Sequence, residues 1–315
     1  MRGSPTATAI FVLVIVAACD GDKEKAAAAK AAADSVTRVA TLADAPRPGA
    51  AVSGFKSPES VLYDSVDDLY FVSNVNGSAH GFISRLKGDG SIDSLMFIAG
   101  GRNGVTLNEP RGSALIGDTL WVADLDAVRA FNIRTAAPVA TVDLKRLGAA
   151  MLNDVATGPD GALYITDTGP GGRSDAKRGN RIFRIGRNHK ASVALHSDSL
   201  GAPNGLAWDA KNDRFIIVQW GGARIIAWHP GDKIARTIGF GAPQMDGVAL
   251  LADGRLIFDS WARKALFVHH HDQETVVKGF DSPADFGVDT RRHRLAIPLY
   301  EKDRVEFWDI PVVAP

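Results

Sequence analysis

The sequence predicts an all-β fold, a six-bladed β-propeller with four-stranded blades. Three observations support it. A similar unit recurs six times, at intervals of about 40–50 residues, which is the length of a propeller repeat. Each unit contains a hairpin in which a DG, DD or ND turn joins two apolar strands, as in DGALYITD and NDRFIIVQ. Two further strands follow each hairpin except the last, which is followed by one, as expected for four-stranded blades that surround a central channel.

Composition supports a folded domain and excludes one class of partner. The chain has 315 residues, of which 45% are hydrophobic, and this is enough to build a core. Lys and Arg together number 36, as do Asp and Glu, so the formal net charge is zero. Without a basic surplus, nucleic acid is not expected as a partner. The sequence does not indicate an oligomeric state.

The first element along the chain is an export signal. Residues 1–19 contain a basic Arg2, a short apolar run and Cys19, the sole cysteine of the chain. The run is too short to cross a bilayer comfortably. The stretch VAAC resembles the bacterial lipobox, which predicts a lipoprotein signal peptide and lipidation of Cys19. An ordinary secretory signal with a chance cysteine is the alternative.

The second element is a tether. Residues 20–49 are rich in Ala, Lys and Asp and contain very few large apolar side chains. They are therefore not expected to form a core. We therefore expect the protein to be lipid-anchored in a bacterial cell envelope, facing the periplasm or the exterior, and to contact the membrane through the anchor alone. The choice between inner and outer membrane stays open.

The propeller is expected over residues 50–315, and its closure can also be predicted. The last unit supplies three strands and ends in DRVEFWDI. AAVSGF, ahead of the first unit, is the counterpart of TVVKGF, ahead of the last. The N-terminal strand should therefore complete the last blade and leave no open edge.

The residue at the start of each innermost strand should face the channel. Across the six units these positions hold Glu59, Arg111, Asn153, Asn204, Asp246 and Ala284. Four of them carry hard oxygen donors, which suit calcium, magnesium or manganese. Gly205 and Gly247 follow two donors and, lacking a Cβ, would allow close approach. The alternative is that these side chains merely solvate a polar channel.

Four motifs resemble those of the senescence-marker-protein, gluconolactonase and luciferin-regenerating-enzyme family of six-bladed propellers. They are ESVLYDSVDDLYFVSN, NDVATGPDGALYITD, PNGLAWD and MDGVALLADGRLIFD. The resemblance covers residues 55 to about 310. It implies one axial divalent metal, calcium in preference to magnesium, manganese or zinc. Glu59, Asn204 and Asp246 would be its main ligands, with Asn153 oriented toward metal or substrate.

The resemblance also implies hydrolysis of a lactone or related small ester, a small-molecule substrate. Asp246 would act as general base and Asn153 would assist catalysis. One family feature is missing, because Met151 stands where sugar-lactone hydrolases carry an arginine. Arg111 would either bind an anionic substrate group or balance the axial acids. A non-catalytic binding propeller with a structural metal is the alternative function, and a strictosidine-synthase-like propeller is a third.

The remaining candidates are given structural interpretations. Asp285, one place beyond the axial position of its unit, is expected at a strand start or turn, with an inward-facing side chain as the alternative. His269 to His271 are expected at an outer strand end and hairpin. Asp124 and Asp167 should cap turns. Three tryptophans are expected in the cores between blades: Trp121, Trp208 and Trp220.

Overall fold

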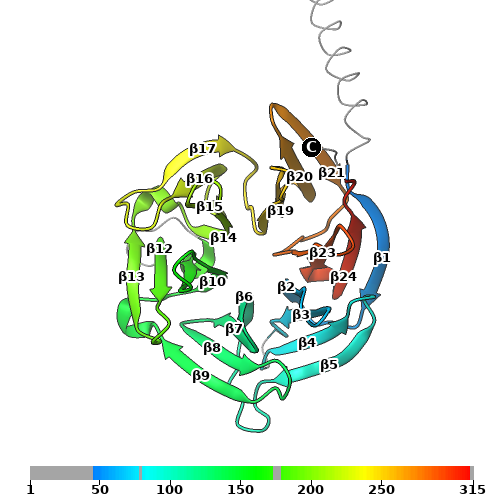
Figure 1. Ribbon diagram of the computed structural model, residues 1–315, viewed down its shortest axis with the longest axis vertical. Helices are drawn as coiled ribbons and strands as arrows, with labels where there is room; N and C mark the ends of the chain where they lie inside the picture. Colours follow the sequence, from blue (N-terminus) through cyan, green and yellow to red (C-terminus); the bar gives the residue numbers. More distant parts are fainter. Residues whose placement is uncertain (1–44, 78–79, 173–178, 313–315) are drawn as a thin grey trace, which may run out of the picture. The chain divides into compact units, whose positions relative to one another are not determined.

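The computed structural model describes residues 45–77, 80–172 and 179–312. Cys19, the signal peptide and most of the predicted tether lie outside these residues. Within them, six four-stranded antiparallel sheets surround a common centre, and the chain passes once around the ring (Figure 1). The prediction of a six-bladed propeller is confirmed.

Each blade is a meander of four strands that runs from the channel outward. The first strand of a blade lies innermost and the fourth outermost. The strands of blades 1 to 3 are β2 (Pro58–Asp64), β3 (Leu69–Asn74), β4 (Phe82–Lys87), β5 (Ile92–Ala99), β6 (Pro110–Ile116), β7 (Thr119–Asp124), β8 (Ala127–Asn132), β9 (Pro138–Asp143), β10 (Leu152–Thr157), β11 (Leu163–Asp167), β12 (Arg181–Ile185) and β13 (Ala191–His196).

Blades 4 to 6 repeat this arrangement, and β1 supplies the outermost strand of blade 6. Their strands are β14 (Pro203–Asp209), β15 (Arg214–Gln219), β16 (Arg224–Trp228), β17 (Arg236–Phe240), β18 (Val248–Leu250), β19 (Leu256–Ser260), β20 (Ala265–His270), β21 (Gln273–Lys278), β22 (Gly287–Asp289), β23 (Arg294–Leu299), β24 (Arg304–Asp309) and β1 (Arg47–Ser53).

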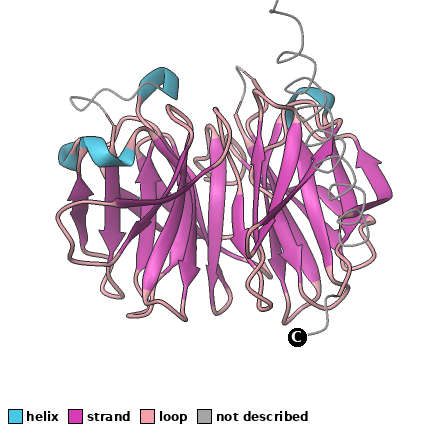
Figure 2. Cartoon of the chain, turned by 90° about the horizontal axis from the view of Figure 1, so that it is seen from above, coloured by secondary structure: helices cyan, strands magenta, loops and turns pink. Residues whose placement is uncertain are grey.

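In the described part of the chain, four short 3₁₀ helices lie in the loops at one end of the ring (Figure 2). This is the end at which the innermost strands begin, and we call it the site end. Among the described residues, no helix is long and apolar enough to span a membrane. The helices are η2 (Lys145–Leu147), η3 (Pro170–Gly172), η4 (Asp198–Leu200) and η5 (Tyr300–Lys302).

The hydrophobic core is divided among the blade interfaces. Six clusters of buried apolar side chains are present in the described part of the chain, each shared by two neighbouring blades. Between blades 3 and 4, for example, Tyr164 packs against Phe215 with ring centroids 4.7 Å apart. Such burial is the main favourable contribution to folding, and here it holds each sheet against the next. The channel is left to polar side chains.

The N-terminal strand closes the ring as predicted. β1 pairs antiparallel with β24, with Ala51 opposite Glu306 and Val52 opposite Val305. β1 begins at Arg47, a few residues before the expected start at Ala50. Because β1 covers the outer edge of blade 6, that blade has the same four strands as the others.

Polar contacts also join blades 6 and 1 at both ends of the ring. At the site end, the backbone N–H of Ser57 donates to Asp303 Oδ1 over 2.8 Å. At the opposite end, Arg292 donates to both carboxylate oxygens of Asp68, at 2.8 and 2.6 Å. A two-pronged arginine–carboxylate pair fixes geometry as well as charge. The junction between the first and last blades is therefore held by strand pairing and by side chains.

Candidate functional site

A cavity of about 370 Å³ opens at the site end of the channel. The starting ends of five innermost strands converge there, as the repeat register predicts. Glu59, Asn153 and Asn204 are the second residues of β2, β10 and β14, and Asp246 lies just ahead of β18. All four line this cavity, together with Arg111 of β6. Ala284 of blade 6 is buried and does not line it.

The four predicted donors share an unusual state. Each is buried, with 1–4% of its surface exposed, and each has one oxygen that accepts no hydrogen bond: Glu59 Oε2, Asn153 Oδ1, Asn204 Oδ1 and Asp246 Oδ1. A buried acceptor without a donor is costly, and such groups call for an explanation. A divalent cation would satisfy all four oxygens at once. The residues present therefore fit a hard metal ion.

The donor set consists of two carboxylates and two amides. Among the described residues, in this cavity or outside it, no three His, Cys, Asp or Glu side chains form a group that could hold a metal ion. Any ion at this place must therefore use the asparagine oxygens. Amide and carboxylate oxygens without sulfur or imidazole are typical ligands of calcium and magnesium.

Other buried carboxyl groups lie near the donors and were not predicted as part of the site. Asp154 is buried and its Oδ2 accepts the backbone N–H of Leu206 at 2.8 Å. Asp259 is also buried, and its Oδ1 accepts the N–H groups of Asp246 and Gly247 at 3.2 and 3.3 Å. The repeat register would have revealed Asp154, because it comes one place after an axial position.

Asp285 has both a structural and an electrostatic role. Its backbone bridges blades 6 and 1, since its N–H donates to the Glu59 carbonyl and its own carbonyl accepts from Val61. This confirms the expected strand-start position. Its carboxylate also accepts from Ser60 Oγ at 2.6 Å and raises the pKa of Glu59 and Asp246, so it belongs to the axial group of acids.

Burial raises the pKa of every acid in this group. Burial and then the charge of Asp285 raise the pKa of Asp246 to about 7, against the opposing effect of Arg111. Burial raises the pKa of Asp285 to about 6. The pKa values of Glu59, Asp154 and Asp259 are raised well above the ordinary range, chiefly by burial. The site thus favours any cation that can offset the negative charge.

Arg111 is the cation that the structure places against this group. Its Nη1 donates to Glu59 Oε1 at 2.8 Å, and its Nη2 lies 3.5 Å from Glu109 Oε2. Of the two roles considered for Arg111, these contacts favour balancing of the axial acids. Glu59 still keeps Oε2 without a partner, so the ion pair does not consume the donor.

Gly205 and Gly247 serve a purpose other than the one expected. A Cβ on Gly205 would lie 2.3 Å from the Asp246 carbonyl oxygen, and one on Gly247 would lie 2.8 Å from the Phe286 ring. The close approach that glycine permits is therefore that of the neighbouring blade, not that of a ligand. It brings the innermost strands together and so brings the donors together.

Turn caps and outer residues match the structural interpretations. Asp124 Oδ1 accepts the N–H groups of Asn108 and Glu109 at 2.9 and 2.7 Å, and Asp167 Oδ1 accepts that of Met151 at 2.8 Å. The three consecutive histidines lie at the end of β20 and in the turn to β21.

The tryptophan prediction is partly wrong. Trp121 belongs to the core between blades 2 and 3, and Trp208 packs against the next one. Trp220 instead lines the axial cavity, next to Trp261 and Tyr300. It follows the last residue of β15 and therefore lies beyond the sheet, where the strand can no longer direct it into the core.

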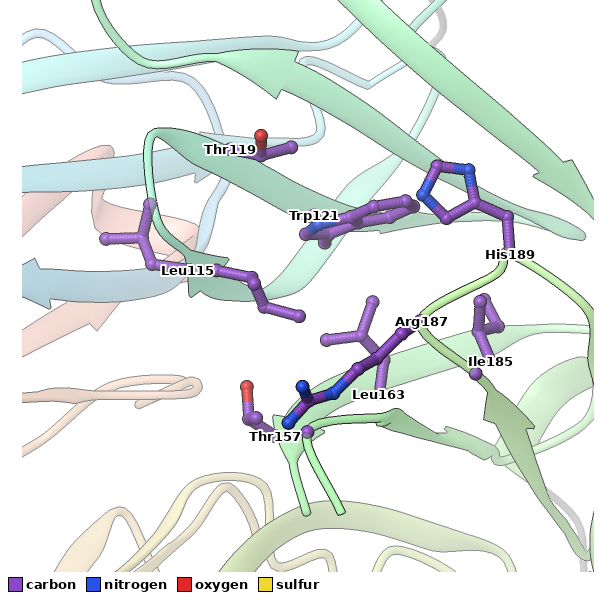
Figure 3. Close-up of a pocket in the computed structure, with 11 residues that line it drawn as sticks. Leu115, Thr119, Trp121, Thr157, Leu163, Ile185, Arg187 and His189 are labelled. Atoms are coloured by element: carbon purple, nitrogen blue, oxygen red, sulfur yellow. The ribbon is translucent and has the colours of Figure 1, made fainter. Parts of the chain in front are cut away.

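A second pocket, of about 530 Å³, lies near the far ends of β6 and β10. Trp121 and His189 lie side by side at its edge, with ring centroids 5.1 Å apart (Figure 3). Its lining includes Leu115, Leu163 and Arg187 but no carboxylate or amide side chain. Its lining offers one imidazole, that of His189, whereas the axial cavity gathers four oxygen donors and remains the candidate site.

The chain resembles one known protein family in sequence and several solved structures in fold. The family model of the SMP-30/Gluconolactonase/LRE-like region matches residues 57–286. No curated protein matches the sequence. One similar solved structure is a gluconolactonase from Xanthomonas campestris, at TM-score 0.63 and 17% identity, covering 85% of this chain and 95% of that chain.

Two lyases have similar structures. Virginiamycin B lyase from Staphylococcus aureus matches at TM-score 0.58 and 12% identity, covering 83% of this chain and 99% of its own. A streptogramin B lyase matches at TM-score 0.59 and 13% identity, covering 85% and 97%. At these identities the likeness establishes the propeller fold alone, so the chemistry must be argued from the site.

Proposed function

We propose that this chain, which belongs to the SMP-30/Gluconolactonase/LRE-like family, is a metal-dependent hydrolase of a lactone or related small ester. The main support is the set of four buried oxygens without hydrogen-bond donors in one cavity. Glu59, Asn204 and Asp246 would hold the ion, with Asn153 at its edge. Calcium is the ion we propose, with magnesium, manganese and zinc as alternatives.

The bound ion would supply a positive charge that polarises the substrate carbonyl and stabilises the oxyanion. The protein supplies the proton transfers. Asp246 accepts a proton from the water that attacks the carbonyl carbon, and the ring C–O bond then breaks as that proton passes to the departing oxygen. Trp261 Nε1 donates to Asp246 Oδ2 at 2.9 Å and fixes the carboxylate for this role. The product is a hydroxy acid.

Asn153 and Arg111 would prepare the site for this reaction. Asn153 reaches the cavity from β10 and can orient the carbonyl beside the ion. Arg111, paired with Glu59, limits the accumulation of negative charge before an ion binds. With Met151 in place of the arginine of sugar-lactone hydrolases, the cavity lacks one polar contact.

The proposal is tested with the soluble protein, stripped of metal with a chelator and reloaded with each candidate ion. We expect hydrolysis of at least one member of a lactone panel, measured as the release of acid. Removal of the metal should abolish this activity. Tight metal binding with background hydrolysis of every lactone and ester would instead support the alternative, a non-catalytic binding propeller with a structural ion.

We propose further that Cys19 is lipidated and tethers the propeller to the cell envelope. Cys19→Ser should shift the protein from the membrane to the soluble fraction of lysed cells and remove the mass of the acyl chains. Retention of Cys19→Ser in the membrane fraction would contradict this proposal, while the hydrolase proposal would be unaffected.

A further inference from the structure

Three aromatic residues occupy equivalent positions in blades 4, 5 and 6. Trp220, Trp261 and Tyr300 each directly follow the second strand of their blade, at the ends of β15, β19 and β23. In each blade this residue donates its backbone N–H to the carbonyl two places before the axial position, at 2.9–3.0 Å. One repeated turn therefore places all three rings at the site end, and Figure 1 shows their blades following one another around half of the ring.

The three rings form a continuous wall. The centroids of Trp220 and Trp261 are 5.3 Å apart, with ring planes at 74°, and those of Trp261 and Tyr300 are 5.4 Å apart, at 47°. All three line the cavity that holds the four donors. We call Trp220, Trp261 and Tyr300 the aromatic wall. Through Trp261 it hydrogen-bonds directly to Asp246.

The equivalent turn in blades 1 and 3 carries no aromatic residue. There the N–H groups that make the same bond, each at 3.1 Å, belong to Val75 and Thr168. Met151 adds an apolar side chain to the cavity lining on the blade 3 side. The apolar character of the cavity is therefore concentrated beside Asp246 and extended by Met151.

Two polar side chains of the lining already donate to the protein. Arg111 donates through Nη1 to Glu59 and keeps only its buried Nε without a partner, and Thr168 Oγ1 donates to the Pro203 carbonyl at 2.6 Å. A polyhydroxylated ring placed against the aromatic wall and Met151 would exchange bonds with water for contacts with carbon. Hydroxyl groups buried in this way are disfavoured, whereas aromatic and alkyl groups gain from leaving water.

From these contacts we infer that the substrate of the proposed hydrolase presents an uncharged aryl or alkyl group to the aromatic wall, in place of the hydroxyl groups of a sugar lactone. This inference rests on the proposed function. Trp220 and Tyr300 then determine specificity through apolar contact. Unlike Trp261, which donates to Asp246, neither is hydrogen-bonded to any of the four metal donors in the structure.

The test compares two six-membered lactones, 3,4-dihydrocoumarin and glucono-δ-lactone, in the metal-loaded protein. The wild type should prefer dihydrocoumarin. Trp220→Ala and Tyr300→Ala should each lower kcat/KM for dihydrocoumarin by about tenfold or more, mainly through KM, as expected for lost apolar contact. The values for glucono-δ-lactone should change less than about threefold.

Conservative and distant variants provide the controls. Trp220→Phe and Tyr300→Phe keep a ring and should recover most of the lost kcat/KM. Trp208→Phe alters a tryptophan that packs on the inter-blade core, with its ring 4.8 Å from that of Phe215, and should leave the preference unchanged. A wild-type preference for glucono-δ-lactone, or an equal loss for both lactones in the alanine variants, would overturn the inference.

Binding of a compound that is not hydrolysed separates this inference from the proposed function. The lactam 3,4-dihydro-2-quinolinone has the bicyclic skeleton of dihydrocoumarin, and its binding can be followed by calorimetry in the metal-loaded protein. Binding that is weakened at least about tenfold in Trp220→Ala, without hydrolysis of any lactone, would support the apolar site and refute the hydrolase. Lactone hydrolysis without lactam binding, and without a preference for dihydrocoumarin, would refute the apolar site and retain the hydrolase.

Discussion

The charge of Asp246 is governed by its immediate neighbours. Burial and then the charge of Asp285 raise its pKa, while Arg111, the Trp261 indole and Asn204 lower it. Arg111 cannot neutralise the whole group of acids, since it already donates to Glu59. An ion placed among the unpartnered oxygens would offset the remaining negative charge. It would also link the protonation state of Asp246 to metal binding.

Replacing Asp246 by asparagine should separate metal binding from folding. Asp246→Asn keeps the shape of the side chain and an oxygen for Trp261 but removes a negative ligand. We expect metal affinity to fall by more than about a hundredfold, beyond the effect of losing an outer-shell partner. Calorimetric titration with calcium and manganese measures this loss.

The matched control is Asp209→Asn. Asp209 is as buried as Asp246 but is the last residue of β14, where its carboxylate accepts from Asn212 and Arg214. It should lower the melting temperature and leave metal affinity intact. Equal metal affinity in Asp246→Asn and the wild type would contradict the assigned site.

The metal-free protein should become less stable as the pH rises from 5 to 8. The pKa values of Asp246 and Asp285 are raised to about 7 and about 6, so the folded protein holds protons that the unfolded chain releases above pH 4. Stability falls with pH wherever the folded state binds more protons. We expect the melting temperature to drop by roughly 5 °C across this range.

Melting curves at pH 5, 6.5 and 8, in the presence of a chelator, measure the effect. The pKa of Asp68, which Arg292 lowers, lies below this window and does not contribute to the change. Saturating calcium should abolish most of the fall, because the bound ion favours the charged carboxylates. A melting temperature that rises between pH 5 and 8 in the metal-free protein would contradict the raised pKa values.

At the scale of the strand, the packing of one blade on the next determines where the donors lie. The backbone N–H of Gly205 donates to the Asp246 carbonyl at 2.9 Å, which ties β14 to the segment before β18. Comparable bonds between Asp285, Glu59 and Val61 tie blade 6 to blade 1. The position of each donor therefore depends on its neighbouring blade.

Gly205→Ala should disturb both stability and metal binding. The added Cβ would lie 2.3 Å from the Asp246 carbonyl oxygen, so the two innermost strands must separate. We expect a loss of about 1–3 kcal/mol in unfolding free energy, as for other overpacked positions, and weaker metal binding. Chemical denaturation and calorimetry measure the two effects.

Gly239→Ala provides the comparison, because its Cβ would meet only Ile225 Cδ1, at 3.9 Å. Gly239→Ala should change the unfolding free energy by no more than about 0.5 kcal/mol. Its metal affinity should equal that of the wild type. Similar behaviour of the two variants would show that the close approach of the strands at Gly205 is unimportant.

The repeats made the strands and four donors predictable, because equivalent positions in a propeller converge. They could not reveal Asp259, which lies one place before the end of its second strand, whereas Asp124 and Asp167 are the last residues of theirs. The difference lies in the partners: Asp124 pairs with Arg129, and Asp167 lies 3.7 Å from Arg181, whereas Asp259 Oδ2 has no partner. Such pairing depends on which strands meet in space, and one sequence does not contain that information.

The aromatic wall was missed for a related reason. In the sequence, a tryptophan just after a strand cannot be distinguished from one at the end of the strand. The three aromatic residues, far apart in the sequence, form a wall only once the blades are placed around the ring. Gly205 and Gly247 could be identified from the sequence, but their role in the close packing of neighbouring blades could not. Residue types can be assigned to repeats from sequence alone, while contacts between blades require the three-dimensional arrangement.

At the scale of the molecule, stability depends on the junction between blades 6 and 1. β1 has almost no buried side chains, so it adds little to the hydrophobic core. Its contribution is the pairing with β24, which removes the open edge of blade 6.

Removal of β1 should therefore destabilise the ring without removing core residues. We expect a chain that begins at Gly54 to melt roughly 10 °C lower than one that begins at Ala45, given about 3–5 kcal/mol from the lost pairing. It should also aggregate through the exposed edge of β24. Scanning calorimetry and light scattering compare the two chains, and equal melting temperatures would contradict the role of β1 in closure.

The placement of β1 beside β24 has a consequence for biosynthesis. A chain emerges N-terminus first, so β1 is the earliest strand of the propeller to appear and its partner is the latest. Any chain interrupted before Arg304 keeps both an unpaired strand and an unfinished blade, the features that quality-control proteases and chaperones recognise. Closure by the N-terminal strand thus distinguishes finished molecules from unfinished ones.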